Sequence, residues 1–188
     1  MGMDWHSHSY EHMHRRRSSF LDMGRIISVL NPSADDIVID VGSGDGIFSI
    51  ELSHRVKEVY ALDLSREAHR LMEQRIRESR AANVHPILAD VCSGIPVKGY
   101  NSVLLVTSFH DFGCKDDLLD ELIKNSSGSL KVAIVEFKKE ETSMGPPMEI
   151  RISREELDAI FKRHGFVSTY YEEMGPLYIN RYERITSG

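Results

Sequence analysis

Short apolar runs alternate with stretches of helical periodicity along most of the chain, and this alternation predicts strands and helices in turn. The run Ile37–Val41 is rich in β-branched residues and too short for a buried helix, so it predicts a buried strand of a parallel sheet. Similar runs predict strands at residues 58–62, 85–89, 101–107, 131–137, 166–171 and 177–182. Apolar residues at helical spacing predict helices at residues 19–30, 47–54, 65–81, 116–124 and 153–164.

Polar residues and glycines mark the ends of these elements. Ser65 predicts the N-cap of the third helix, and Ser153 with Glu156 three residues later predicts a capping box at the start of the last one. Residues 126–129 predict a turn. Residues 138–147 predict an irregular exposed loop, because they are charged and contain a Gly-Pro-Pro sequence.

Strands that alternate with helices imply an α/β fold with a doubly wound, mostly parallel sheet. The last two strands, joined by residues 172–176, add an antiparallel edge. The length of 188 residues, 41% of them hydrophobic, suits one domain. We place that domain at residues 20–188, after a polar tail at residues 1–19.

The polar tail is rich in histidine and arginine and has no buried-face pattern. Two of its histidines lie four residues apart, a spacing that on a helix can bind a metal, but nothing in the pattern fixes a coordination geometry. We therefore interpret the tail as a solvated terminus without a metal, and leave open that its arginines neutralise an anionic acceptor. The residues are His6, His8, His12, His14, Arg15, Arg16 and Arg17.

Charge and cysteine content narrow the classes of function. A formal net charge of -6 makes the molecule a poor electrostatic match for nucleic acid. The chain has neither a run of about 18 apolar residues nor an apolar signal-peptide core, so we expect a cytoplasmic protein without a membrane segment. Cys92 and Cys114 form neither a C-x-x-C pair nor a zinc spacing, and we expect reduced thiols.

The first strand ends in a glycine-rich turn. Gly42 permits a tight turn, Gly44 lets backbone N–H groups approach a ligand, and Gly46 lets the next helix pack closely. Asp63 follows the second strand about 20 residues later, where an acid accepts hydrogen bonds from ribose hydroxyls. Asp90 follows the third strand. This pattern favours a nucleotide-like ligand, although a glycine-rich turn without a ligand has the same local sequence.

The charge of the turn indicates which ligand. A pyrophosphate is usually bound by a helix N-terminus without adjacent carboxylates, whereas this turn contains Asp40 and Asp45 and no lysine or arginine. A phosphate-free cation with ribose hydroxyls, such as S-adenosylmethionine, suits these acids better. A nicotinamide-dependent oxidoreductase is a weaker alternative, because Ile47 stands where G-x-G-x-x-G needs its last glycine.

The sequence Asp-Val-Gly-Ser-Gly-Asp-Gly at residues 40–46 resembles the D/E-x-G-x-G-x-G motif of class I S-adenosylmethionine-dependent methyltransferases. The resemblance extends over residues 37–182 and implies a seven-stranded sheet of order 3-2-1-4-5-7-6 with an antiparallel last strand. It also implies that the glycine loop holds the methionine part of the cofactor, that Asp63 holds the ribose, and that Asp90 with Val91 meets the adenine. The implied cofactor-binding residues are Asp40, Gly42, Ser43, Gly44, Gly46, Asp63, Leu64, Asp90, Val91 and Thr107.

Segments further along the chain bear on the acceptor. Residues 107–112, 137–141 and 145–147 resemble the branch that includes ubiquinone/menaquinone-type methyltransferases, whose members use different acceptors. The chain lacks the N-P-P-Y type segment of many enzymes that methylate adenine or glutamine amides, and we expect a small-molecule acceptor. His110 is the candidate general base, with a packing role under the cofactor as the alternative. Asp111 either orients His110 or caps the following turn. A non-catalytic binding module with this fold is the second hypothesis.

Overall fold

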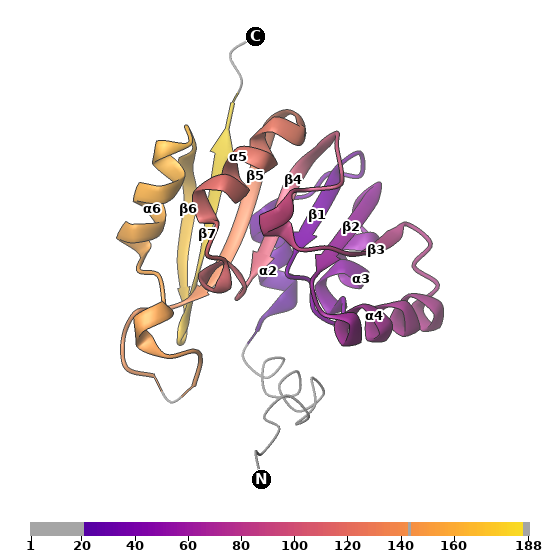
Figure 1. Ribbon diagram of the computed structural model, residues 1–188, viewed down its shortest axis with the longest axis horizontal. Helices are drawn as coiled ribbons and strands as arrows, with labels where there is room; N and C mark the ends of the chain where they lie inside the picture. The colour runs from indigo at the N-terminus through magenta and orange to yellow at the C-terminus, as the bar shows by residue number, and fades with distance from the viewer. Residues whose placement is uncertain (1–20, 143, 186–188) are drawn as a thin grey trace.

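A seven-stranded sheet of order β3-β2-β1-β4-β5-β7-β6 forms the centre of the protein (Figure 1). The computed structural model describes residues 21–142 and 144–185. Strands β1 to β5 are parallel, and β7 pairs antiparallel with both β5 and β6. This confirms the predicted strand order and the antiparallel last strand. The strands are β1 Ile37–Val41, β2 Glu58–Asp63, β3 Val84–Leu88, β4 Tyr100–Val106, β5 Ser126–Phe137, β6 Val167–Met174 and β7 Leu177–Arg184.

Helices cover both faces of the sheet, as an alternation of strands and helices requires (Figure 1). On one face α2, α3 and α4 pack with the sheet around Ile26, Leu52 and Met72, and on the other α5 and α6 pack around Leu119 and Phe161. The helices are α2 Met23–Leu30, α3 Ile47–Ser53, α4 Arg66–Ser79, α5 Lys115–Asn125 and α6 Arg154–Arg163. Three single 3-10 turns are η1 Val91–Ser93, η2 Phe109–Asp111 and η3 Met148–Ile150.

Two predicted helix starts are confirmed at the level of hydrogen bonds. The Ser65 hydroxyl accepts the Ala68 N–H at 3.2 Å and caps α4. At α6 the Glu156 N–H donates to Ser153 Oγ, and the Ser153 N–H donates to the Glu156 carboxylate. The two bonds at α6 form the capping box and pair two donors that a helix N-terminus otherwise leaves unpaired.

Two predicted turns are wrong because strand pairing continues through them. Residues 126–129 belong to β5, where Ser126 pairs with Tyr100 across a register shift in the β4–β5 ladder. Residues 172–174 belong to β6, so only Gly175 and Pro176 separate β6 from β7. In both segments polar side chains on an exposed stretch of strand produce the same pattern as a loop.

The expectation of reduced cysteines is also wrong. Cys92 in η1 and Cys114 at the N-cap of α5 form a disulfide, with their Cα atoms 5.6 Å apart. Both residues lie in connections that leave the carboxyl edge of the sheet, one after β3 and the other after β4. The fold brings these two connections together, which a separation of 22 residues in the sequence did not reveal.

Within the described part of the chain, no helix combines the length and the apolar character needed to cross a bilayer. The predicted tail at residues 1–19 and its histidine cluster lie outside the described residues.

Candidate functional site

The glycine turn after β1 folds back on β2 and packs against the chain that follows β4. The N–H groups of Gly42 and Ser43 both donate to the Leu62 carbonyl, at 2.9 and 3.1 Å. Gly42 has φ +71°, and a Cβ atom there would lie 2.6 Å from the Cβ of Ser108. Gly46 has φ +78°, and a Cβ atom there would lie 2.5 Å from a side-chain carbon of Met72 in α4. A side chain at either position would need both a strained backbone and displaced neighbours.

This turn lines a cavity of about 100 Å³. The cavity lies at the carboxyl ends of β1 and β4, the edge of an open parallel sheet where ligands bind. In Figure 1 this edge is the lower one, from which the loop after β5 also leaves. Its lining residues are Leu21, Met23, Asp40, Gly42, Ser43, Gly44, Asp45, Ile47, Phe48, Val106 and Thr107.

The Asp40 carboxyl group lies almost completely buried in the cavity wall. Its pKa is raised from 3.8 to about 7, mainly by desolvation on burial and to a smaller extent by the neighbouring carboxylates of Asp63 and Asp45. A hydrogen bond from the Ser49 hydroxyl, at 2.6 Å, acts in the opposite direction because it favours the ionised form. Asp40 therefore exchanges its proton near neutral pH, in a position where a bound cation would keep it ionised.

The second acid of the turn has a partner that the sequence did not indicate. An Arg75 guanidinium nitrogen from α4 lies 2.6 Å from Asp45 Oδ2. The local sequence around the glycines has no basic residue, so the turn looked more acidic than it is. The sequence did not indicate Arg75 as a partner, because it lies 30 positions from Asp45, on the exposed face of α4.

Two residues that line this cavity carry hydroxyl groups that lack hydrogen-bond partners within the described residues. They are Ser43 Oγ and Thr107 Oγ1, and both are fully shielded from solvent. Thr107 also has φ +51°, a conformation that a β-branched residue rarely adopts, and it is 4% exposed. A buried polar group without a partner and a strained backbone at the same residue are typical of a ligand site.

Asp63 is held rigidly at the end of β2. Its Oδ2 accepts the Gly44 N–H and its Oδ1 accepts the Ser65 N–H, both at 2.8 Å. These two bonds orient the carboxylate beside the glycine turn and leave lone pairs on both oxygens for further donors. Leu64, the next residue, is 69% exposed. An apolar side chain exposed beside an oriented acid can cover the flat face of a ligand.

Asp90, the third predicted acid, accepts hydrogen bonds from the protein's own chain. Asp90 accepts the Cys92 N–H at 2.9 Å and the Ser93 hydroxyl at 3.2 Å, and so caps η1. Val91 is buried beneath this turn. Among the described residues, the lining of the cavity includes neither Asp90 nor Val91, nor Asp63 or Leu64. The structure thus gathers Asp40, Gly42, Ser43, Gly44 and Thr107 around one cavity, with the other predicted residues in the adjoining loops.

His110 lies outside this cavity, in η2, and forms a buried pair with Glu136 on β5. His110 Nδ1 lies 2.6 Å from Glu136 Oε2, and the His110 backbone N–H donates to Oε1 of the same carboxylate at 3.2 Å. Asp111 Oδ1 lies 3.5 Å from His110 Nε2. Glu136 is the residue that sequence reasoning missed, although a carboxylate inside a run of buried apolar residues was a signal that it needs a partner.

Solved structures of methyltransferases share this architecture. A SAM dependent methyltransferase from Aquifex aeolicus superposes with a TM-score of 0.83 at 23% identity, over 90% of this chain and 93% of that one. Precorrin-6y C5,15-methyltransferase from Geobacter metallireducens GS-15 superposes with a TM-score of 0.66 at 15% identity, over 85% and 86%. At these identities the likeness establishes the fold alone.

Sequence comparison identifies a similar curated protein. The chain is 34% identical over 79 residues to a probable cobalt-precorrin-6B C(15)-methyltransferase (decarboxylating) from Methanococcus maripaludis strain C7. The match covers 42% of this chain and 44% of that relative, so it spans less than half of either protein. This comparison does not test the resemblance to the ubiquinone/menaquinone-type branch, which stays a prediction.

The family itself is established by a match over more of the chain. A model described as a methyltransferase domain matches residues 38–132, just over half of the 188 residues. The matched segment runs from β1 into β5 and includes the glycine turn, Asp63, Asp90 and Thr107. The chain therefore belongs to the methyltransferase domain family.

Proposed function

We propose that this protein transfers a methyl group from S-adenosylmethionine to a small-molecule acceptor. The observation that carries the proposal is a pair of buried hydroxyls without partners among the described residues, those of Ser43 and Thr107, on residues that line one cavity with Asp40 at the glycine turn. The cofactor, when bound, supplies an electrophilic methyl group on a sulfonium. Family membership and the curated relative named as a probable cobalt-precorrin-6B methyltransferase support a methyl transfer to a small molecule.

The residues around the cavity suit this cofactor. Ser43 and Thr107 offer hydroxyls to its polar amino-acid end, and ionised Asp40 offers the negative charge that its cationic groups require. Asp63, already oriented by two backbone donors, would accept the ribose hydroxyls. Asp90 and Val91 would meet the adenine, the role that the resemblance to class I methyltransferases implies for them, and the exposed Leu64 would contribute to the same cofactor site.

The protein's main task in such a transfer is to align the acceptor, since proximity and orientation supply about 7 to 11 kcal/mol of the barrier reduction. An acceptor that must lose a proton also needs a base. We assign that role to His110 and give Glu136 a positioning role, because its carboxylate lies against Nδ1 and fixes the ring. Thr107 in the cavity wall and His110 are only three residues apart.

Calorimetry with S-adenosylmethionine tests the cofactor assignment directly. Wild-type protein should bind it, and Asp63→Ala should weaken binding by about 10- to 100-fold, the loss expected for hydrogen bonds to a charged group. Asp35→Ala is the matched control, because this exposed acid lies before β1, at the opposite edge of the sheet. No binding by the wild type at millimolar cofactor would refute the proposal.

Turnover separates the enzyme from a non-catalytic binding module. Fractions of cell extract incubated with radiolabelled cofactor should yield S-adenosylhomocysteine and a labelled product, and Asp63→Ala should abolish both. Binding without turnover in any fraction would favour the module instead. A fluorescence titration with reduced nicotinamide cofactor tests the oxidoreductase alternative, which requires a tight complex.

The acceptor found in that screen allows a test of the base. His110→Gln should lower kcat and remove one limb of its pH profile, whereas Glu136→Gln should keep that limb at a shifted position, because the ring remains but loses the carboxylate beside Nδ1. Equal pH profiles for wild type and His110→Gln would leave His110 with a packing role.

A further inference from the structure

A second hollow lies next to the cofactor cavity and is the larger of the two, at about 570 Å³. It is formed by η2, the start of α5, the loop after β5 and one side of α6. A volume of this order is typical of small-molecule sites. Its lining includes His110, Lys115, Lys139, Ile150, Arg151 and Ile160.

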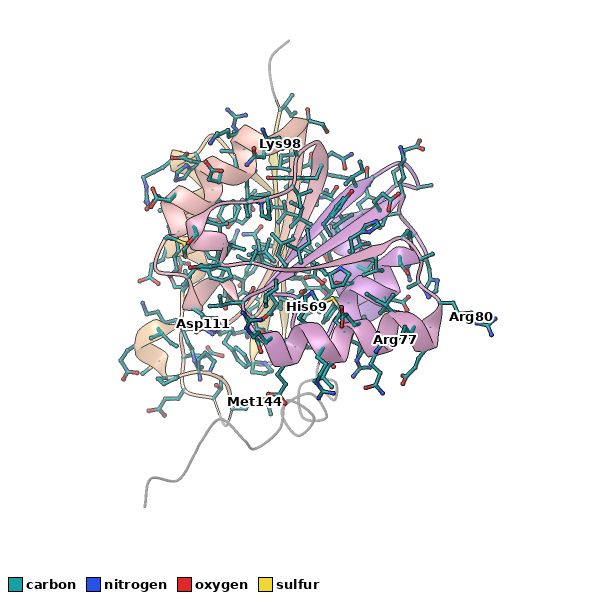
Figure 2. All side chains as sticks on the ribbon, turned by 45° about the vertical axis from the view of Figure 1, so that its right-hand side comes forward. His69, Arg77, Arg80, Lys98, Asp111 and Met144 are labelled. Atoms are coloured by element: carbon teal, nitrogen blue, oxygen red, sulfur yellow. A yellow bond between two sulfur atoms is a disulfide. The ribbon has the colours of Figure 1, made fainter. Side chains whose placement is uncertain are left out.

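The hollow is close enough to the cofactor cavity to present an acceptor to it. Thr107 lines the cavity and His110 lines the hollow, and the chain between them spans at most about 10 Å even when fully extended. Both residues follow β4 at the carboxyl edge of the sheet. Asp111, the neighbour of His110, and Met144 of the loop after β5 both lie toward the lower side of the view in Figure 2.

Lys115 contributes a positive charge to this hollow without a carboxylate partner in the described part of the chain. Its ammonium group donates to the carbonyl oxygens of His110 at 3.2 Å and Phe112 at 2.5 Å, and lies 5.9 Å from the centre of the Phe109 ring. All of these groups are neutral. An ammonium group has three N–H donors, so one remains for a ligand.

Arg151 contributes a second charge of the same kind. It is only 6% exposed, its guanidinium lies 5.6 Å from the centre of the Phe137 ring, and its hydrogen bonds go to four carbonyls and one hydroxyl. Among the described residues it too has no carboxylate partner. A buried cation surrounded by neutral groups attracts an anion strongly, because little solvent screens it. The carbonyls belong to Lys138, Glu140, Met144 and Pro146, and the hydroxyl to Thr142.

The other charges of the hollow largely cancel. Lys139 pairs with Glu156 at 2.7 Å, and Arg163 pairs with Asp116 at 2.9 Å. Glu149 is a further carboxylate of the lining and is exposed. The lining contains four basic residues and two carboxylates in all, so a positive surplus remains at Lys115 and Arg151.

Apolar side chains make up much of the remaining wall. Ile152 and Ile160 line the interior, and Ile150 lies at the exposed mouth. Met148 is also exposed, on the same 3-10 turn as Ile150. A ligand that matches this lining has an apolar body and an anionic group.

We propose that this hollow is the acceptor site and that it takes an apolar small molecule carrying a carboxylate, held by Lys115 and Arg151. The acceptor role rests on the proposed methyl transfer. The preference for an apolar carboxylate does not, since it follows from the charges and the apolar wall of the hollow itself. The carboxylate receives the third N–H of Lys115 and the second N–H of Arg151 Nη2, an atom that donates only to the Met144 carbonyl among the described residues. The apolar body lies against Ile152 and Ile160.

A matched pair of probes tests the charge preference. 1-Naphthoate and its neutral isostere 1-naphthamide have the same apolar body, and wild-type protein should bind the carboxylate about tenfold more tightly in calorimetry. Lys115→Met should remove this preference while it keeps a side chain of similar length. Lys98→Met is the control, because Lys98 is exposed and lies near the opposite end of the molecule in Figure 2, and it should keep the full preference.

Three results would overturn the charge assignment. They are equal affinity for the two probes, no binding of naphthoate at millimolar concentration, or an equal loss of preference in Lys98→Met and Lys115→Met. Arg151→Lys provides a second variant, which keeps the charge but not the planar geometry and should retain part of the preference.

Saturation with S-adenosylhomocysteine tests the acceptor role separately. Naphthoate should still bind to the saturated protein, because an acceptor and a cofactor must be held at the same time. Displacement of naphthoate by S-adenosylhomocysteine would overturn the acceptor role. If S-adenosylmethionine fails to bind while the naphthoate preference persists, the proposed function fails and the anion-binding hollow stands.

Discussion

Replacing Asp40 with asparagine should remove a loss of stability that accompanies rising pH in the wild-type protein. In the folded protein burial raises the pKa of Asp40 from 3.8 to about 7. The unfolded chain exposes this carboxyl group to water, so its pKa there is the ordinary one. Between these two values the folded state binds more protons than the unfolded state, and stability falls as pH rises. Asparagine has the same shape and no titration, so Asp40→Asn lacks this loss.

The magnitude follows from the size of the pKa difference. A rise from 3.8 to about 7 is roughly three units, and each unit corresponds to about 1.4 kcal/mol, so the full effect is about 4 kcal/mol. The part that falls between pH 5 and pH 8 is about 2.5 kcal/mol, because some of the loss occurs below pH 5. Against a total stability of about 5 to 15 kcal/mol this is a large fraction.

Urea denaturation of wild type and Asp40→Asn at intervals from pH 5 to pH 8 measures the difference. The free energy of unfolding of the variant should rise relative to that of wild type as pH rises, and its slope against urea concentration should not change. Asp36→Asn is a control whose stability should run parallel to that of wild type over this range. Burial raises the pKa of Asp36, but hydrogen bonds from Lys131, Ser33 and Asn101 outweigh burial and lower it below 3.8, so above pH 5 the carboxylate is ionised in both the folded and the unfolded state. Parallel profiles for wild type and Asp40→Asn would refute the reasoning.

Three further predictions concern the disulfide, the glycine turn and the cavity. Replacing Cys92 and Cys114 by serine should lower the free energy of unfolding by about 3 kcal/mol, because the disulfide closes a loop of 22 residues in the unfolded chain. Thermal unfolding measures this, and equal melting temperatures would contradict it. Gly46→Ala should cost about 1 to 3 kcal/mol more than Gly99→Ala, since both glycines have positive φ but only Gly46 would meet another side chain. Thr107→Val should leave stability unchanged or raise it by about 1 kcal/mol while calorimetry shows weaker cofactor binding, because the hydroxyl that it removes has no partner in the described protein.

The sheet could be predicted from the sequence because each strand is a short buried run and each run is followed by a helix. The first five runs fall within β1 to β5 to within a residue or so, except that β5 starts five residues earlier than predicted. That error has a physical cause. The start of β5 is only partly buried, and its polar residues leave no apolar alternation to detect, although Ser126 pairs with Tyr100 in the β4–β5 ladder.

Partners of the site residues could be predicted only where they are close in the chain. The Ser153 capping box is a local pattern and was found. Arg75 and Glu136 could not be assigned to Asp45 and His110, because these pairs are separated by 30 and 26 residues and depend on how the elements pack. The Cys92–Cys114 pair failed for the same reason.

These missed partners change the argument about the charge of the glycine turn. The sequence suggested a strongly negative site, but Arg75 neutralises one of its acids and the raised pKa leaves Asp40 partly protonated near pH 7. On the proposed function, a bound cation would favour the ionised form of Asp40 and so displace its proton. Binding of the cofactor should therefore tighten as pH rises through about 7, over the range in which the free protein loses stability. On the proposed function, the buried carboxylate that weakens the fold is also the group that would make the cavity selective for a cation.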